Sequence, residues 1–251
     1  MKKTICLILA FSLFICPITV NADGVQNWYI KYPKEGGRPV PMDGSALPDE
    51  YGALYMGNPD EKVIYLTFDA GYGNENVDSI LDTLKKHEVN ATFFILPAIL
   101  EYNLPTVERM IADGHLIGNH SYSHRNMGAV SDLSAFKEEL EKAEKVFFEK
   151  TGKEMTKFFR PPEGAFSEKM LCFCRELGYT PVFWSFAYAD WDNGKQPDLE
   201  YAKNKILSTA HNGEIMLLHP NSATNAAILD EVITELKAEG YSFGQLTDIC
   251  R

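Results

Sequence analysis

The chain has 251 residues, of which 45% are hydrophobic and 24% are charged, and its formal net charge is −11 at pH 7. This composition excludes a collagen-like or intrinsically disordered chain and predicts a sizeable buried core. The excess of negative charge argues against nucleic acid or an anionic membrane as a partner, because binding to phosphate groups is largely electrostatic. A neutral or cationic partner suits this charge better.

The first 22 residues have the pattern of a secretory signal peptide. The segment MKKTICLILAFSLFICPITVNA begins with two lysines, continues with an apolar run over residues 5–18 and ends in small residues, which predicts export and cleavage after Ala22. A retained membrane anchor is the alternative, but the apolar run is shorter than the roughly 20 residues that span a bilayer. Cleavage removes two lysines and no acid, so the net charge becomes −13. We therefore expect an extracytoplasmic protein.

Three of the five cysteines lie beyond this segment. Cys172 and Cys174 are two residues apart in a helical pattern and face different directions, so we expect small buried apolar side chains rather than a mutual disulfide. The spacing leaves open whether Cys250 pairs with either of them.

The rest of the chain divides into a lead segment and a region of alternating elements. Residues 23–60 are rich in Pro, Gly and Asp and show little periodicity, which predicts an extended segment lying on the domain rather than a domain of its own. From residue 61, apolar strand-like runs alternate with helical patterns. The predicted strands are 62–68, 91–96, 115–119, 157–160, 180–186, 214–219 and 241–246. The predicted helices are about 76–87, 104–113, 132–150, 167–178, 198–210 and 224–239.

Continuous apolar strands separated by helices indicate a parallel sheet that is buried on both faces. A barrel of alternating strands and helices commonly occupies about 250 residues. An open doubly wound sheet is the alternative, although no glycine-rich phosphate-binding turn follows the first strand.

Unusual polar residues follow the strand-like runs. They are Asp69 after the first run, His120 and His124 after the third, Arg160 after the fourth, Asp190 and Trp191 after the fifth, and His219 after the sixth. The carboxyl ends of parallel barrel strands meet at one face and carry the functional residues there. We therefore expect these side chains to converge.

The segment NHSYSH places His120 and His124 four residues apart. If it turns helically, both imidazoles point the same way and can bind one divalent ion, whereas a pair of capping histidines is the structural alternative. The arrival of Asp69 at the same rim favours the metal, because two histidines and a carboxylate form an open site for zinc or a similar ion.

Two further groups have the chemistry of proton transfer. Arg160 is followed by two prolines that fix its backbone, and its expected role is to keep a carboxylate ionised and in one orientation, with a surface ion pair as the alternative. His219 leaves an apolar strand and is predicted to donate a proton, with Asp190 as the residue that orients it. A satisfied core histidine is the alternative reading of His219.

In their order and spacing, these residues resemble the polysaccharide deacetylase family, also called the NodB homology domain or carbohydrate esterase family 4. The matching segments are TFDAGY, HSYSH, RPPEG, ADW and LLH, and the resemblance covers about residues 61–247. Within the family, YGALYMGNPDEKVIYLTFDAGY, RPPEGAFSE and FWSFAYADWD most resemble the delta-lactam-forming peptidoglycan deacetylases of spore formers, which act on N-acetylmuramic acid. The resemblance implies an α/β fold, a distorted (β/α) barrel of about seven parallel strands, forming a single domain over residues 61–251.

The resemblance also implies metal-dependent amide hydrolysis. The implied roles are general base for Asp69, metal ligands for His120 and His124, orientation of the base for Arg160, tuning of the acid for Asp190, lining of the acetyl pocket for Leu217 and general acid for His219. The expected cofactor is a divalent ion, Zn²⁺ or else Co²⁺, Mn²⁺ or Ni²⁺. We further expect backbone amides near Glu163 to hold the oxyanion, and Trp191 and Tyr188 to offer apolar faces to a sugar ring.

One position departs from the family pattern. Most members have a second Asp after the base, and that Asp binds the metal, whereas this chain has Ala70, which has no ligand atom. Either Asp69 also reaches the metal or water takes the vacant place. The delta-lactam branch also tends to lack the second acid, which favours a remodelled site over an inactive one.

We therefore expect a monomeric deacetylase whose partner is the peptidoglycan glycan strand, with a role in the spore cortex. Three alternatives stay open. The substrate is N-acetylglucosamine in peptidoglycan or in a chitin-like glycan; the chain is a glycan-binding module without activity; or it is a glycosidase, for which Asp69 and Asp190 are the only obvious carboxylate pair.

Overall fold

The computed structural model describes residues 24–33, 37–42 and 47–249. The predicted signal peptide lies outside these ranges and stays a prediction. Cys250 also lies outside them, so its pairing with Cys172 or Cys174 stays open. Within them, no helix is long and apolar enough to cross a membrane.

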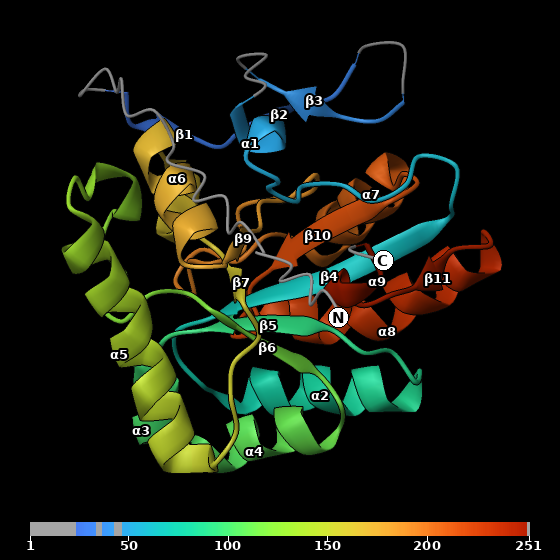
Figure 1. The fold of residues 1–251 in the computed structure, drawn as a ribbon. Helices are drawn as coiled ribbons and strands as arrows, with labels where there is room; N and C mark the ends of the chain where they lie inside the picture. Colours follow the sequence, from blue (N-terminus) through green and yellow to red (C-terminus); the bar gives the residue numbers. More distant parts are fainter. Residues whose placement is uncertain (1–23, 34–36, 43–46, 250–251) are drawn as a thin grey trace, which may run out of the picture.

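A curled parallel sheet of seven strands forms the centre of the molecule (Figure 1). Its strand order is β10-β4-β5-β6-β7-β9, and β11 also pairs with β4. The strands are β4 (Val63–Ala70), β5 (Thr92–Ile95), β6 (Leu116–Asn119), β7 (Phe158–Phe159), β9 (Thr180–Pro181), β10 (Glu214–Leu218) and β11 (Ser242–Phe243). A parallel bridge between Phe186 and Met216 joins the chain after β9 to β10, so the sheet curls toward closure. The predicted distorted barrel is confirmed.

Helices follow the strands and cover the sheet. They are α2 (Glu75–Lys86), α3 (Pro97–Tyr102), α4 (Leu104–Ala112), α5 (Leu133–Thr151), α6 (Glu168–Glu176), α7 (Leu199–Thr209), α8 (Ala223–Ala238) and α9 (Leu246–Ile249). Short 3₁₀ turns are η1 (Met127–Ala129) and η2 (Pro162–Gly164). In α2, Val77, Ile80, Leu81 and Leu84 recur at helical spacing and are all buried, which explains why this segment forms an amphipathic helix against the sheet.

The six predicted helices agree with the structure within two residues at either end. Helix α3 was not predicted, because it is short and begins at a proline directly after β5. The predicted strand over 180–186 was too long. After β9 the amides of Val182, Phe183 and Ser185 donate to three different segments, at Phe159, Leu54 and Ile215, so no regular ladder continues. Similarly, the predicted strand over 241–246 stops at Phe243 and gives way to α9.

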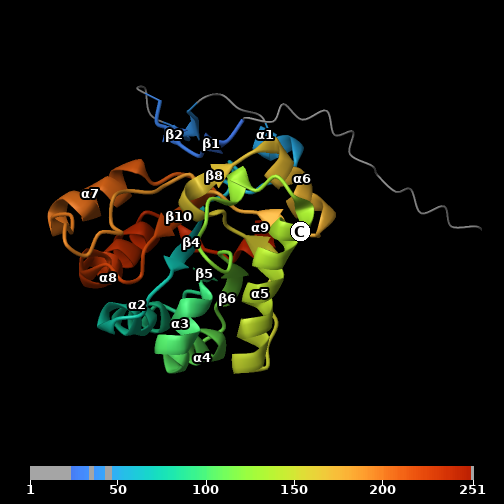
Figure 2. The same ribbon diagram turned by 90° about the vertical axis from the view of Figure 1, so that its left-hand side faces the viewer.

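The lead segment packs on the side of the molecule opposite α2 and α4 (Figures 1 and 2). It contains β1 (Gln26–Asn27), β2 (Ile30–Lys31), β3 (Val40–Pro41) and α1 (Leu47–Glu50). β1 pairs antiparallel with β8 (Ala165–Phe166), and β2 pairs with β3. Trp28 is 2% exposed and stacks on Phe183 with ring centroids 4.7 Å apart. The lead segment therefore contributes to an apolar cluster next to the RPPEG loop.

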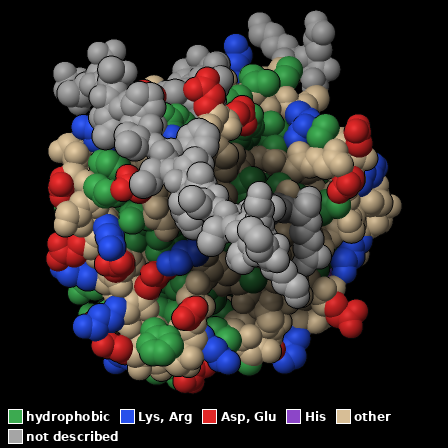
Figure 3. Space-filling model, viewed as in Figure 1, with side chains coloured by type: hydrophobic (Ala, Val, Ile, Leu, Met, Phe, Trp, Pro, Cys, Tyr) green, Lys and Arg blue, Asp and Glu red, His purple; other side chains and the backbone are tan. Residues whose placement is uncertain are grey.

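The surface carries both signs of charge. On the face in Figure 3, acidic and basic side chains are interspersed rather than gathered by sign. Several ion pairs on α5 and α7 join lysines and glutamates one helical turn apart, as in Lys142–Glu138 and Lys203–Glu200.

Candidate active site

A buried ion pair lies at the carboxyl end of β4. Arg160 Nη1 donates to Asp69 Oδ1 at 2.9 Å; the arginine side chain is fully buried and that of the aspartate is 11% exposed. The remaining guanidinium nitrogens are also bonded, Nε to Val182 O and Nη2 to Phe183 O, both at 3.2 Å. The guanidinium also lies 4.2 Å from the centroid of the Phe94 ring. The guanidinium is therefore held by three hydrogen-bond partners and an aromatic ring.

The ion pair controls the protonation state of Asp69. Burial alone raises the pKa of its carboxyl, but Arg160, His120 and His219 together lower that pKa below the ordinary value. Burial lowers the pKa of Arg160, and Asp69 partly offsets the effect. A guanidinium keeps its proton even so, and the carboxylate beside it is ionised at neutral pH.

The two histidines of NHSYSH lie side by side, with ring centroids 5.1 Å apart. No helix forms there, so the helical turn that would align the two imidazoles is absent. Instead, Ser121 (φ 70°) and His124 (φ 56°) adopt left-handed backbone conformations. Asn119 Oδ1 accepts the amide of Ser121 at 2.8 Å, and Ser121 Oγ accepts the amide of His124 at 3.0 Å. These local bonds, rather than helical spacing, bring the imidazoles together.

His120 is prepared as a neutral imidazole. Its Nδ1 donates to Arg160 O at 2.9 Å, and its Nε2 lies 3.7 Å from Asp69 Oδ2. Because Arg160 O only accepts, the proton is on Nδ1 and the Nε2 lone pair faces the carboxylate. Burial lowers the pKa of His120 to about 4. A neutral imidazole whose other nitrogen is bonded to a carbonyl is the usual form of a metal-binding histidine.

The donor chemistry at this point fits a divalent ion. His120 and His124 supply imidazoles, and Asp69 supplies the nearest carboxylate. Ala70 is 1% exposed and belongs to the apolar core, so it contributes no donor. Across residues 24–33, 37–42 and 47–249, no group of three or more His, Cys, Asp or Glu side chains meets the spacing of a metal-binding cluster. The described residues therefore bring two imidazoles together without a third side-chain donor at ligand spacing.

A second hydrogen-bonded pair follows β10. His219 Nδ1 donates to Asp190 Oδ1 at 2.8 Å, and the backbone amide of His219 donates to Asp190 Oδ2 at 2.8 Å. The side chain of Asp190 is 1% exposed, whereas that of His219 is 23% exposed. The predicted contact between Asp190 and His219 is therefore present, and the imidazole keeps one edge open to the solvent.

His219 and Asp69 influence one another. Burial lowers the pKa of His219, but the hydrogen bond and charge of Asp190, together with the charge of Asp69, raise it above its ordinary value. His219 in turn helps to lower the pKa of Asp69. The site thus holds an ionised carboxylate, able to accept a proton, and an imidazole that favours its protonated form, able to donate one.

The structure places the other predicted site residues around these pairs. Trp191 is 60% exposed, and its ring centroid lies 6.3 Å from that of His219. Leu217 is 5% exposed on β10. Glu163 is exposed in η2 with a left-handed backbone (φ 59°). Tyr188 is half-buried, and its hydroxyl donates to Asn225 Oδ1 inside the protein. Only the ring of Tyr188 is therefore left to face a sugar.

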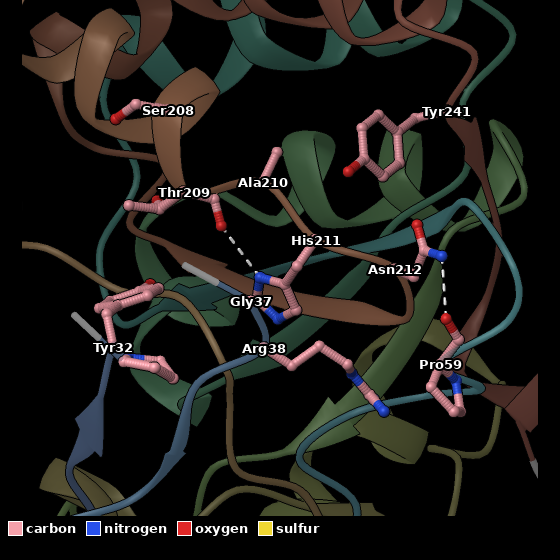
Figure 4. Close-up of a pocket in the computed structure, with 11 residues that line it drawn as sticks. Tyr32, Gly37, Arg38, Pro59, Ser208, Thr209, Ala210, His211, Asn212 and Tyr241 are labelled. Carbon is pink, nitrogen blue, oxygen red and sulfur yellow. Dashed lines mark hydrogen bonds between the residues drawn. The ribbon is translucent and has the colours of Figure 1, made fainter. Parts of the chain in front are cut away.

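A hydrogen-bonded cluster of Ser185, His211 and Glu214 lies at the opposite end of β10 from His219. Figure 4 shows His211 in the wall of a cavity of about 470 Å³. His211 Nε2 lies 2.9 Å from Ser185 Oγ, and Nδ1 lies 3.1 Å from Glu214 Oε2. This order of groups resembles a serine hydrolase relay. However, Ser185 is fully buried and its Oγ accepts the amide of Ile215 at 3.1 Å, so the cluster joins β10 to the chain after β9.

Comparison with known proteins decides the family. The sequence model of the family described as polysaccharide deacetylase matches residues 56–182 of this chain. The chain belongs to the polysaccharide deacetylase family. It is therefore a hydrolase that acts on carbon–nitrogen amide bonds, as the motifs predicted.

Individual relatives agree with this family. The chain is 36% identical to the peptidoglycan-N-acetylmuramic acid deacetylase PdaA of Bacillus subtilis, over 98% of this chain and 95% of PdaA. The solved structure of B. subtilis PdaA, described as a family 4 carbohydrate esterase, matches with a TM-score of 0.85 at 38% identity and covers 90% of this chain and 97% of that one. A peptidoglycan-N-acetylglucosamine deacetylase of Bacillus cereus is 33% identical over 76% of this chain and 89% of its own length.

Two residues of this polysaccharide deacetylase were missed from the sequence. Asn119 shapes the histidine loop, and its Nδ2 also donates to Leu140 O at 3.0 Å. Asn225, on α8, donates to Asp190 Oδ2 at 2.6 Å. The position of Asn119 directly before His120 was a usable signal, because asparagine often bonds to the backbone two residues on. Nothing in the sequence around Asn225 points to Asp190, 35 residues away.

Proposed function

We propose that this polysaccharide deacetylase removes the acetyl group from N-acetylmuramic acid residues of peptidoglycan. The single observation that supports it most is a pair of groups with opposite pKa shifts in one site: Arg160 is bonded to Asp69 and lowers its pKa, and Asp190 is bonded to His219 and raises its pKa. Amide hydrolysis requires both, because a water must lose a proton and the amine that departs must gain one.

Asp69 is the proposed general base. Its Oδ1 is held by Arg160 at 2.9 Å, which leaves Oδ2 as the oxygen that accepts the proton of the attacking water. The guanidinium holds the carboxylate in one orientation throughout, so little reorganisation is needed when the proton moves.

His219 is the proposed general acid. Its Nδ1 is bonded to Asp190, so the proton for the departing sugar nitrogen comes from Nε2. Protonation of the nitrogen is essential because an amide anion is a very poor leaving group. The backbone amides near Glu163 are proposed to bond to the oxyanion, and Leu217 to contact the methyl group of the acetyl.

His120 and His124 are the proposed ligands of a divalent ion, with Zn²⁺ as the first candidate. When bound, such an ion polarises the acetyl carbonyl and lowers the pKa of a coordinated water. Around it, His120 keeps its Nε2 lone pair available through the bond from Nδ1 to Arg160 O, and Asp69 accepts the proton.

The comparison with PdaA supports muramic acid as the substrate. The relative that carries that name aligns over 98% of this chain, whereas the B. cereus relative named for N-acetylglucosamine aligns over 76% of it. Deacetylation of N-acetylglucosamine is the second candidate, favoured by that relative. A glycosidase is disfavoured because Asp69 and Asp190 are bonded to Arg160 and His219 rather than free to flank a glycosidic bond.

The sequence carries the remaining parts of the proposal. The signal-like residues 1–22 support export to the cell envelope, and the resemblance to delta-lactam-forming enzymes supports a role in the spore cortex. We place the catalytic domain at residues 61–251, and the enzyme acts as a monomer.

The test is an assay of acetate and of new amine on glycan strands stripped of stem peptides, with and without a chelator. We expect both products in equal amounts, from muramic acid and with loss of activity in chelator that added Zn²⁺ restores. Acetate released from N-acetylglucosamine alone would favour the second candidate. Retention of glycan without any acetate would favour a binding module and overturn the proposal.

A further inference from the structure

The buried amide of Asn225 connects both members of the Asp190–His219 pair. Asn225 is 1% exposed near the start of α8. Its Nδ2 donates to Asp190 Oδ2 at 2.6 Å and to the backbone oxygen of His219 at 3.1 Å. Its Oδ1 accepts the hydroxyl of Tyr188. One side chain thus contacts the carboxylate, the backbone of the histidine and a tyrosine.

The orientation of this amide follows from its partners. Asp190 Oδ2 and His219 O can only accept hydrogen bonds, so the NH₂ group must face them. The hydroxyl of Tyr188 then meets the amide oxygen, which fixes the side chain from the other end. No rotated amide satisfies the same three partners.

The carboxylate of Asp190 depends on Asn225 for its second oxygen. Oδ1 accepts the imidazole of His219, while Oδ2 accepts the backbone amide of His219 and the side chain of Asn225. Asp190 is almost fully buried, and a carboxylate without these donors has no solvent to replace them. Removal of Asn225 leaves one donor on Oδ2 and allows the carboxylate to rotate.

Asn225 is itself held by the loop network behind it. Ser222 Oγ accepts the amide of Asn225 at 3.1 Å and donates to Gln196 Oε1 at 2.6 Å. Gln196 Nε2 donates to Asp190 O at 3.1 Å. The start of α8 is therefore fixed to the same loop that carries Asp190.

We propose that Asn225 is a positioning residue of the deacetylation reaction: it fixes the Asp190 carboxylate and the His219 backbone so that the imidazole holds its Nδ1 proton toward Asp190 and presents Nε2 to the substrate. This inference rests on the proposed role of His219 as the general acid. It adds that the rate of the chemical step depends on the side-chain amide of Asn225, which does not contact the substrate.

The test compares Asn225→Ala with Asn221→Ala, a control in the same loop. Asn221 Nδ2 donates to Asn193 Oδ1 at 3.0 Å, and among the described residues its side chain has no hydrogen bond to Asp190 or His219. We expect Asn225→Ala to lower kcat about 10–100-fold with KM within about twofold of the wild type. Asn221→Ala should keep the wild-type kcat. A folded Asn225→Ala with a kcat within about twofold of the wild type would overturn the proposal.

Two further variants cover the case in which Asn225→Ala does not fold. Asn225→Leu keeps the approximate size of the side chain but has no donor, so we expect the same loss of kcat. Tyr188→Phe leaves the donor and removes only the bond that fixes the amide, so we expect a smaller loss of kcat with an unchanged KM. Wild-type kcat in a folded Asn225→Leu would contradict the proposal.

A spectroscopic measurement separates this inference from the proposed function. At a pH high enough to deprotonate the imidazole, the ¹⁵N signals of His219 in the wild type should report a single tautomer protonated at Nδ1. In Asn225→Ala or Asn225→Leu we expect a mixture of tautomers at the same pH. An unchanged spectrum would overturn the positioning role, whereas a wild type that releases no acetate would overturn the proposed function and leave the spectroscopic result intact.

Discussion

The Arg160 guanidinium is fully buried and donates from Nη1 to Asp69 Oδ1 at 2.9 Å, although 91 positions separate the two residues. The pair combines a structural task with a chemical one. Its other nitrogens bond to the backbone of the chain after β9, so the same arginine links three segments and orients the proposed base.

Substitution of Asp69 separates these two tasks. Asp69→Asn can still accept from Arg160, so we expect a folded protein with no acetate release, because an amide does not take a proton from water. Asp69→Ala leaves a buried guanidinium without its partner, which typically costs about 3–5 kcal/mol of unfolding free energy. Acetate assays and chemical denaturation of both variants provide the measurement. Wild-type turnover in folded Asp69→Asn would remove Asp69 from the mechanism.

Arg160→Met tests the electrostatic role of the arginine. Arg160 lowers the pKa of Asp69, so its loss raises that pKa and the base needs a higher pH to ionise. We expect the acidic limb of the kcat/KM profile to move to higher pH, with the alkaline limb moving less. The variant also loses about 3–5 kcal/mol of stability, so profiles should be recorded well below its Tm. An unmoved acidic limb would show that the arginine does not act on the base.

The pH profile of the wild type should be bell-shaped. Asp69 has a lowered pKa and must be ionised, so activity appears as pH rises through the acidic range. His219 has a pKa raised above 6.5 and must be protonated, so activity declines only above that value. In Asp190→Asn the charge that raises this pKa is gone, so the alkaline limb should move to lower pH. His219→Ala, by contrast, should abolish turnover at every pH. If the alkaline limb of Asp190→Asn lies at the same pH as that of the wild type, the result argues against His219 as the general acid.

Ala70→Asp tests how the metal is held. The new carboxylate sits in an apolar environment at the end of β4, so without metal we expect a lower Tm than in the wild type. With Zn²⁺, we expect tighter binding by calorimetry, about tenfold or more, and a larger rise in Tm than in the wild type. Ala70→Asn is the matched control without a charge. Identical zinc titrations of wild type and Ala70→Asp would show that the ion is held elsewhere.

Trp191→Ala tests contact with the glycan. Trp191 is 60% exposed next to His219, so its loss should leave the Tm unchanged and raise KM about 2–10-fold, the equivalent of roughly 0.4–1.4 kcal/mol. Tyr201, which is 59% exposed on α7, provides a comparison, and Tyr201→Ala should leave KM unchanged. Equal effects of the two variants would indicate that Trp191 has no special contact with the substrate.

The sequence by itself determined most of the fold and the position of the site along the chain. Apolar runs and helical periodicity located the six long helices within two residues, because burial imposes a period of 3.6 on a helix that covers a sheet. The order of the motifs identified Asp69, Arg160, Asp190 and His219. Parallel strands explain most of this success, because Asp69 lies at the end of β4, and Arg160 and His219 directly follow β7 and β10, whose carboxyl ends meet at one face. Asp190 lies in the irregular chain after β9.

Only the tertiary structure decided how these groups act on one another. The imidazoles of His120 and His124 meet through left-handed turns and the side chain of Asn119, which no helical spacing describes. Asn225 reaches Asp190 from α8, and the pKa of Asp69 is lowered because the charges of its neighbours, Arg160 first, outweigh the effect of burial. Such effects depend on distance and exclusion of water in three dimensions, and contacts between segments far apart in the chain leave no periodic signal in the sequence.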